Sequence, residues 1–409
     1  MKPMGPIPAD YGSRNGELVV AGNPVSHWIA QAGATPLFVY DGAMIERRIA
    51  DLRAAMPSRL AIHYAIKANS FAPLLTRMTG LVDGFDVASG GELAMATAAG
   101  MDAARISFAG PGKDDAEIAG AVAAGATLNL ESARELDRAL AAGERLGRMP
   151  RLAIRVNPDF DLKGSGMKMG GGAKPFGIDA ARVPALVRRV VEAGAEWRGF
   201  HIFAGSQALS AEAVIETQGQ TLALAVRLAE EAGVALPHCN LGGGFGIPYF
   251  PGDTPLDIAA VGSALGEALD ALPAAYAKTQ FAIELGRYLV GEAGVYLARV
   301  LDVKNSHGES YAVIDGGLHH QLAASGNFGT VVKRNYPVAV ANRFDAASAE
   351  YAQTVVGRLC TPIDRLADKV ALPPIAEGDV IAIFCAGAYG ASASPAAFLG
   401  HGPAREILG

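Results

Sequence analysis

Lys67 is the first residue in this sequence whose placement suggests chemistry. It lies in IHYAIKANS, residues 62–70, within a strand-like run of apolar residues. A buried ammonium without a partner is strongly disfavoured, and its usual escape is a depressed pKa. The neutral amine that results is a nucleophile and forms Schiff bases with carbonyl groups. Taken alone, these nine residues favour a simpler interpretation, an edge strand whose lysine reaches water along its aliphatic stem.

Two further segments carry groups that suit a charged ligand. LGGGFG, residues 241–246, places glycines between a strand and a helix, where backbone amides can surround a phosphate. A flexible turn is the simpler explanation of that triplet, and Ser206 is a further possible donor to a phosphate. Glu284 and Arg287, in ELGR, form a local ion pair by default. A carboxylate can also hold a protonated ring nitrogen, and a guanidinium can hold a phosphate.

The elements that would position these residues alternate from residue 45 to about residue 290. Short apolar runs, the candidate strands, cover residues 62–66, 84–87, 106–108, 127–130, 152–156, 199–203, 238–241 and 281–283. Segments with helical spacing lie between them, one of which begins with a capping box of Ser132 and Glu135. Eight such units predict an α/β fold, a (β/α)8 barrel. An open doubly wound sheet is the competing arrangement, but no GxGxxG opens an early helix.

The sequence changes character after about residue 290. AGVYLARVLDVKN, SYAVIDGG, PVAVAN, YAQTVVGRLC and DVIAIFCAGAYG are short strands separated by turn residues. They predict a C-terminal antiparallel β domain, a sandwich or small barrel. TPLFVYD, residues 35–41, is expected to pair into the same sheet. The predicted domains are therefore a barrel at 45–290 and a discontinuous β domain at 1–44 and 291–409.

Composition and charge narrow the classes of partner. The 409 residues carry a formal net charge of −6, which argues against nucleic acid or an anionic membrane as partner. The eight histidines and three cysteines show no metal-ligand spacing, so we expect no metal site. Neither a signal peptide nor a membrane-length apolar run is present, and we expect a cytoplasmic protein.

In a (β/α)8 barrel, chemistry is found where the strands end, and every expected strand end here is polar or rich in glycine. Strand ends and later segments together show HYAIKANS, FDVASGGEL, NLGGGFG, ELGRY, VIDGG and CAGAYG, in that order. These six motifs, in this order, resemble those of the fold-type III pyridoxal-phosphate decarboxylases, and the resemblance covers nearly the whole chain. That family comprises the diaminopimelate, ornithine and arginine decarboxylases, whose barrel is similar to that of alanine racemase.

The resemblance implies pyridoxal 5′-phosphate as cofactor, with Lys67 as the lysine that binds it covalently. It implies that the phosphate is surrounded by Gly243, Gly244, Ser206, Arg287 and Tyr389. It also implies that Glu284 pairs with the ring nitrogen and that Asp86 and Phe203 lie at the cofactor. In Phe203 this chain departs from the family, which usually has a histidine stacked on the ring.

The activity that the resemblance implies is α-decarboxylation of an amino acid through an external aldimine and a quinonoid. Glu284 favours this over racemisation on the same fold, because alanine-type racemases place an arginine there. Cys360, in GRLCTPID, occupies the position of the family's proton-donating cysteine, which crosses a homodimer interface into the partner's site. A non-catalytic homologue would have no need of Lys67, Glu284 and Cys360 together. A lone cysteine is otherwise a small buried hydrophobe, as we expect for Cys239 and Cys385.

The remaining departures from the family concern the substrate. Thr361 and Asp364 lie where ESGD usually follows the cysteine, and LHHQLAASGNFG, with His319, replaces the arginine and tyrosine that hold diaminopimelate's distal carboxylate. FLGH stands in place of a closing YN. We therefore expect Thr361, Asp364 and His319 to contact a different amino acid, either free or attached to an acyl carrier protein. CTPID and FAGSQ are similar to the decarboxylases of exosortase gene clusters and of carrier-bound glutamyl groups. meso-Diaminopimelate remains the alternative substrate.

Overall fold

The computed structural model describes residues 1–409 except 163–166, 169 and 328–332. The described chain divides into two compact units. The barrel unit comprises Ile49–Gly246 and Leu256–Leu285, and the second unit comprises Met1–Arg48, Ile247–Pro255 and Gly286–Gly409. The domain boundaries predicted from the sequence stay a proposal.

Eight parallel strands close a barrel within the described part of the first unit. They are β5 (Leu60–Ala65), β6 (Gly84–Val87), β7 (Ile106–Phe108), β8 (Thr127–Leu130), β9 (Arg151–Asn157), β12 (Glu196–Ile202), β14 (His238–Gly243) and β15 (Gln280–Leu285). Their order is β9-β12-β14-β15-β5-β6-β7-β8, and β8 pairs with β9 to complete the circle. A short strand, β11 (Ile178–Asp179), pairs in parallel with β9. The predicted barrel is thus confirmed, and the open sheet is excluded.

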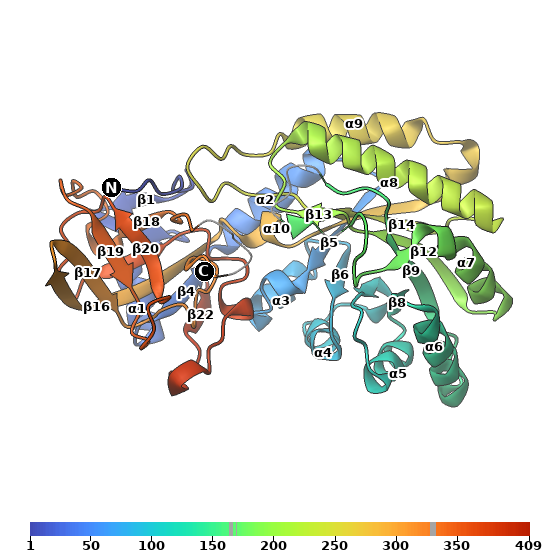
Figure 1. Cartoon of the computed structure of the whole chain (residues 1–409), viewed down its shortest axis with the longest axis horizontal. Helices are drawn as coiled ribbons and strands as arrows, with labels where there is room; N and C mark the ends of the chain where they lie inside the picture. Colours follow the sequence, from blue (N-terminus) through green and yellow to red (C-terminus); the bar gives the residue numbers. More distant parts are fainter. Residues whose placement is uncertain (163–166, 169, 328–332) are drawn as a thin grey trace. The chain divides into compact units, whose positions relative to one another are not determined.

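Helices surround the barrel strands, as Figure 1 shows. They are α3 (Ala72–Met78), α4 (Gly90–Ala98), α5 (Asp115–Ala124), α6 (Ala133–Leu146), α7 (Val183–Glu192), α8 (Ala211–Ala232) and α9 (Ile258–Asp270). Ser132 caps α6 by accepting a hydrogen bond from the backbone N–H of Glu135, as predicted. The reciprocal half of the predicted capping box is absent, because Glu135 accepts from the N–H of Glu131 instead.

The second unit contains a mixed sheet. Its strands are β4 (Leu37–Tyr40), β16 (Gly294–Ser306), β17 (Glu309–Ile314), β18 (Val338–Val340), β19 (Gln353–Val356), β20 (Arg365–Val370), β21 (Val380–Ile383) and β22 (Arg405–Leu408). β4 pairs with β16 as the sequence predicted. The expectation of a wholly antiparallel sheet is wrong, because β17 pairs with β19 and β22 with β4 in parallel. Each of these parallel pairs is joined by a long connection rather than a hairpin, which permits that direction.

Several small elements complete the described chain. They are a three-stranded sheet of β1 (Gly12–Arg14), β2 (Glu17–Val20) and β3 (Asn23–Pro24), the helices α1 (Val25–Ala32), α2 (Gly42–Ala55) and α10 (Arg287–Val290), and the pair β10 (Met167–Lys168) and β13 (Gly205–Ser206). None of the helices in the described ranges combines the length and apolar character that a bilayer span requires.

Candidate active site

Lys67 lies just beyond the end of β5, in a single 3-10 turn, Ile66–Ala68. Ile66 and Ala68 are buried, whereas Lys67 is exposed. Lys67 thus follows its strand, as the predicted strand 62–66 implies, but the expectation that its amine is buried is wrong, because the strand ends at Ala65 and the turn directs the next side chains differently. The ammonium nitrogen lies 5.9 Å from the centre of the Phe203 ring. Lysine and aromatic ring are thus near neighbours at the carboxyl end of the barrel.

Glu284 is a buried carboxylate near the end of β15. Its Oε2 lies 2.7 Å from His201 Nε2 and accepts a hydrogen bond of 3.1 Å from Asn240 Nδ2. Burial alone would raise the pKa of Glu284, but His201, Lys67 and Arg155 outweigh it and hold the pKa well below its usual value. The carboxylate is therefore ionised, so it can hold a proton on a ring nitrogen.

Asp86 lies on β6, two strands from Glu284 in the barrel order. It is buried, and its Oδ2 lies 3.5 Å from His63 Nδ1. Burial lowers the pKa of His63, yet the charge of Asp86 raises it overall. Asp86 therefore contributes negative charge to the barrel interior next to an imidazole.

The glycine run at the end of β14 leaves no room for larger residues. Gly244 has φ +80°, and a Cβ there would lie 2.2 Å from the carbonyl oxygen of Gly205. A Cβ on Gly243 would lie 1.9 Å from the carbonyl oxygen of Glu284. The backbone N–H of Ala208 donates to the carbonyl of Gly244 at 2.9 Å, which joins this run to the loop that carries Ser206. Two closely packed loops with small side chains form a cradle suited to a phosphate.

Arg287 and Tyr389 come together in the second unit. The guanidinium carbon of Arg287 lies 4.8 Å from the centre of the Tyr389 ring and 5.3 Å from that of Tyr249. Its Nη1 donates to the Tyr249 hydroxyl at 2.9 Å. Burial would lower the pKa of Arg287, but the hydroxyls of Tyr249, Tyr389 and Tyr336 raise it overall. Its buried Nε has no hydrogen-bond partner among the described residues. Buried polar groups normally have a partner, so this Nε is suited to donate to an anionic ligand.

The three cysteines differ in exposure. Cys360 is an exposed free thiol, whereas Cys239 and Cys385 are buried. Burial raises the pKa of Cys239 to about 12, and that of Cys385 also rises well above its usual value. The prediction that these two are small buried hydrophobes is confirmed. Thr361, beside Cys360, is half-buried in a turn in which its N–H donates to the carbonyl of Leu359.

Asp364 organises the segments around Cys360 and His319. Its Oδ1 accepts from the backbone N–H of Leu318 at 2.7 Å, and its Oδ2 accepts from that of Leu359 at 2.9 Å. The carboxylate thus links the residue before His319 to the residue before Cys360. Both of its oxygens are engaged by the protein's own backbone. This geometry favours a positioning role over the substrate contact that we expected.

His319 is fully buried, and neither of its ring nitrogens has a hydrogen-bond partner among the described residues. Its ring lies 3.8 Å from that of His320 and 5.3 Å from that of His401, measured between centres. Burial, followed by His320 and His401, lowers the pKa of His319 to about 4. His319 is therefore neutral near pH 7. Phe328 and Gly329, the last residues of LHHQLAASGNFG, lie outside the described residues.

Sequence reasoning missed four residues beside these groups. His201 and Asn240 contact Glu284, and Tyr249 and Tyr336 surround Arg287. His201 stands two positions before Phe203, which directly follows the end of β12, so the alternation of an extended chain could have placed both on one side. No comparable pattern marks the two tyrosines. Among the described residues, no group of three or more His, Cys, Asp or Glu side chains is arranged to hold a metal ion.

The residues present fit pyridoxal phosphate. An ionised carboxylate suits the ring nitrogen, an exposed lysine suits the aldehyde, and a glycine cradle and an arginine with an unpartnered Nε suit the phosphate. These donors belong partly to the barrel unit and partly to the second unit.

Comparison with known proteins agrees with this donor set. Residues 42–291 match the family model described as pyridoxal-dependent decarboxylase, pyridoxal binding domain. The L-glutamyl-[BtrI acyl-carrier protein] decarboxylase of Niallia circulans is 38% identical over 381 residues, which cover 91% of this chain and 88% of that protein. A diaminopimelate decarboxylase of Neisseria meningitidis is 33% identical over 377 residues, which cover 89% of this chain and 87% of that protein.

Solved structures show the same relationship. The diaminopimelate decarboxylase from M. jannaschii in co-complex with L-lysine superposes with a TM-score of 0.86 at 25% identity. The match covers 98% of this chain and 92% of that one. The chain therefore belongs to the pyridoxal-dependent decarboxylase family, and it is an amino-acid decarboxylase that uses pyridoxal phosphate.

Proposed function

We propose that this decarboxylase acts on a glutamyl-type amino acid attached to an acyl carrier protein. The relative from Niallia circulans, 38% identical, is named for that reaction. A second candidate substrate is meso-diaminopimelate, because several relatives about one-third identical are named as diaminopimelate decarboxylases. The two substrates differ at the end remote from the reacting carbon. Diaminopimelate ends in an ammonium and a carboxylate, whereas a carrier-bound glutamyl group ends in an uncharged linkage.

The observation that carries the proposal is that the Asp364 carboxylate is used by backbone N–H groups and that His319 is neutral. Both carboxylate oxygens of Asp364 are used by backbone N–H groups, so this acidic residue is poorly placed to pair with a distal ammonium. His319 is buried, and its lowered pKa keeps it neutral, so it offers no positive charge to a distal carboxylate. Each charge-assisted hydrogen bond that is lost forfeits about 1.5–3 kcal/mol. An uncharged distal group suits such a site better than diaminopimelate does.

Pyridoxal phosphate, when bound, supplies an electron sink for the electron pair that departing CO₂ leaves on the α-carbon. Lys67 would hold the cofactor covalently through its Nζ. Ionised Glu284 would keep the ring nitrogen protonated, because a nearby negative charge favours the cationic form. Phe203 would pack against the ring in place of the usual histidine, and Asp86 would lie beside it.

The remaining residues would bind the phosphate and return a proton. Gly243, Gly244 and Ser206 would contribute the loop amides and a hydroxyl, and Arg287 and Tyr389 a guanidinium and a phenol. We propose that Cys360 Sγ–H donates the proton that replaces CO₂ on the substrate, from the partner subunit of a homodimer. Thr361 would line the same turn, and Asp364 would hold that turn and His319 in place.

Steady-state kinetics on three substrates test this function. Glutamyl-carrier protein, meso-diaminopimelate and free glutamate would be compared by CO₂ release, with Cys360→Ala as a matched low-activity control. We expect the carrier-bound substrate to exceed the other two in kcat/KM by orders of magnitude. Efficient turnover of diaminopimelate, with kcat/KM near about 10⁴ M⁻¹s⁻¹ or above, would instead identify it as the substrate.

A further inference from the structure

A cavity of about 410 Å³ opens within the barrel unit at the amino-terminal ends of the strands. Leu60, Ile106, Thr127, His238 and Gln280 line it, and each is the first residue of its strand. Because all the barrel strands are parallel, this end is opposite to the one that carries Lys67. The volume lies in the range of small-molecule sites, roughly 300–1,000 Å³. Two lining residues, Asn240 and His63, also contact Glu284 and Asp86 of the candidate active site, but the proposed reaction gives the cavity itself no role.

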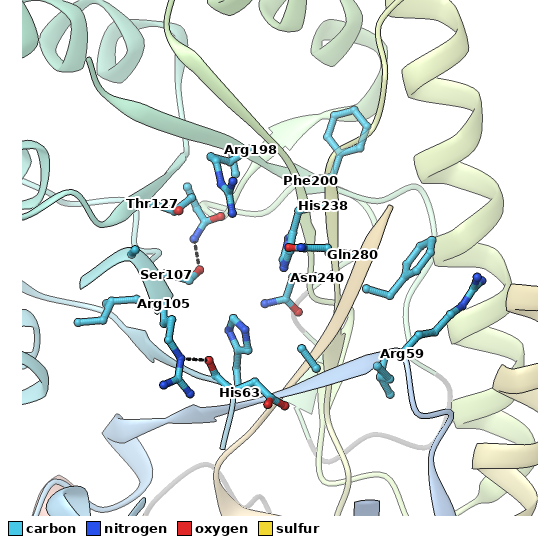
Figure 2. A pocket seen from close by; sticks show the side chains of 18 of the residues that line it. Arg59, His63, Arg105, Ser107, Thr127, Arg198, Phe200, His238, Asn240 and Gln280 are labelled. Atoms are coloured by element: carbon cyan, nitrogen blue, oxygen red, sulfur yellow. Dashed lines mark hydrogen bonds between the residues drawn. The ribbon is translucent and has the colours of Figure 1, made fainter. Parts of the chain in front are cut away.

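The cavity lining is strongly basic. It includes Arg53, Arg59, Arg105 and Arg198, but Asp83 is the only carboxylate among the lining residues. Arg53 is paired with Asp83 at 3.0 Å, and Arg105 donates to backbone carbonyls. Figure 2 shows the Arg59 side chain directed away from the open space, and Arg59 donates to the carbonyl of Leu269. Arg198 is the arginine that points into the space in this view.

Arg198 carries positive charge that its neighbours do not balance. Its Nη1 lies 3.2 Å from Glu196, which Arg151 contacts at the same distance, so two guanidinium groups share one carboxylate. Its buried Nε has no hydrogen-bond partner among the described residues. Burial, followed by Arg151, lowers the pKa of Arg198. A group in this condition gains from a bound negative charge.

Two imidazoles face the same space from other strands. His63 is 9% exposed, and its Nδ1 makes no hydrogen bond in the described chain but lies 3.5 Å from Asp86 Oδ2, which leaves its Nε2 as the donor toward the cavity. Its ring centre is 6.2 Å from that of His238. Burial, then His63 and Arg198, lowers the pKa of His238 to about 3, so the site disfavours any further positive charge. Figure 2 shows His63, His238 and Arg198 around one open region.

We propose that this cavity is a binding site for a small oxyanion such as inorganic phosphate, held by Arg198, His63 and His238. Two guanidinium nitrogens on one edge suit the oxygens of a phosphate, and imidazole N–H groups add donors from other sides. Amide and hydroxyl groups of Asn129, Ser107 and Thr127 also line the wall. The site is separate from the cofactor's own phosphate cradle, which lies at the other ends of the strands.

The test titrates inorganic phosphate into cofactor-saturated enzyme by isothermal titration calorimetry at constant ionic strength. Saturation with cofactor occupies its phosphate cradle, so added phosphate reports on the cavity. We expect one saturable site per chain that sulfate competes for and chloride does not. Arg198→Gln should weaken phosphate binding by about tenfold or more, since a charge-assisted contact is lost. Arg59→Gln is the matched control, because it removes the same charge from a side chain that is directed away from the open space and so cannot contact the phosphate. It should change the affinity for phosphate by less than about twofold.

Three results would overturn the proposal. These are the absence of saturable phosphate binding to the wild type, equal competition by chloride, or equal weakening by Arg198→Gln and Arg59→Gln. Thermal unfolding of each variant without phosphate separates loss of the site from loss of the fold. If Arg198→Gln unfolds early, Arg198→Lys replaces it, which keeps the charge but not the planar fork and should give an intermediate affinity.

Discussion

Lys67 stands exposed between two buried residues, and that contrast sets the first prediction. Because Ile66 and Ala68 anchor the turn, removing the lysine side chain should leave the fold intact. Lys67→Ala is expected to bind pyridoxal phosphate only non-covalently and to lose nearly all decarboxylation. Borohydride reduction followed by peptide mass spectrometry measures the adduct, which the wild type should carry on Lys67. Finding it on any other lysine would refute the assignment.

Glu284 depends on His201 for its ionised state. The pKa of Glu284 is lowered in the folded protein, so its ionised form stabilises the fold above its ordinary pKa, and this contribution fades as pH falls. In His201→Leu, burial remains and the opposing hydrogen bond is gone, so the pKa of Glu284 should rise. The acid limb of the kcat/KM profile should then move to higher pH.

The conservative variant His201→Gln serves as the control for that prediction. Glutamine can still donate to Glu284 Oε2, so its acid limb should move less than that of His201→Leu. The cofactor's absorption spectrum, followed over the same pH range, gives a second measurement. An acid limb that stays in place in His201→Leu would show that His201 does not set the charge of Glu284.

At the scale of elements, the glycine run at the end of β14 offers a matched comparison. Gly244 and Gly252 have nearly the same backbone conformation, φ +80° and φ +83°, but only Gly244 has close neighbours. An alanine at either position meets the left-handed strain of about 1–2 kcal/mol. Gly244→Ala should in addition displace the carbonyl of Gly205 and weaken cofactor binding by about tenfold or more. Cofactor titration by absorbance and thermal unfolding measure the two effects.

Gly252→Ala should lose some stability and keep the cofactor affinity of the wild type. Equal affinities in the two variants would mean that the cradle formed by Gly244 does not contact the cofactor. Gly219→Ala, inside α8 with open space around it, should be neutral or stabilising and checks the baseline.

The barrel strands could be predicted from the sequence because buried apolar runs mark them directly. Candidate strands at 84–87, 106–108 and 127–130 coincide with β6, β7 and β8. The pairing direction in the second unit could not be predicted. The residues of β17 and β19 show the same apolar pattern whether the two strands pair in parallel, as they do, or antiparallel. Long-range contacts decide such pairings, and local pattern does not record them.

Prediction of site residues succeeded where a motif fixed the position and failed where tertiary contacts decide the role. The glycine run and Glu284 lie at strand ends, as expected from their motifs. The exposure of Lys67 depends on where β5 ends. The use of Asp364 by the distant backbone amide of Leu318, together with that of nearby Leu359, depends on loop packing. Tyr389 beside Arg287 was predicted from a motif, but Tyr249 and Tyr336 come from segments that no motif connects.

At the scale of the whole molecule, the proposed catalytic residues are divided between the two units. Lys67 and Glu284 belong to the barrel unit, and Cys360 belongs to the second. The relatives match this chain over both units, with 91% of it covered in the comparison with the Niallia circulans protein. The second unit is therefore part of what the family shares, which fits a role for it in catalysis.

Cys360 provides the last prediction, a test of the proposed homodimer. Its thiol is exposed, while Leu359 and Asp364 beside it are buried, so a fixed turn presents the thiol to the outside of its own unit. Lys67→Ala and Cys360→Ala should each be nearly inactive. If Cys360 enters the partner's site, a mixed dimer has one site with both wild-type residues. Random exchange should then restore about a quarter of the wild-type sites, because half the dimers are mixed and each has one complete site.

Recovery of activity after mixing, with subunit exchange verified by native mass spectrometry, measures this restoration. Exchange without recovery would place Cys360 in its own subunit's site or outside the reaction.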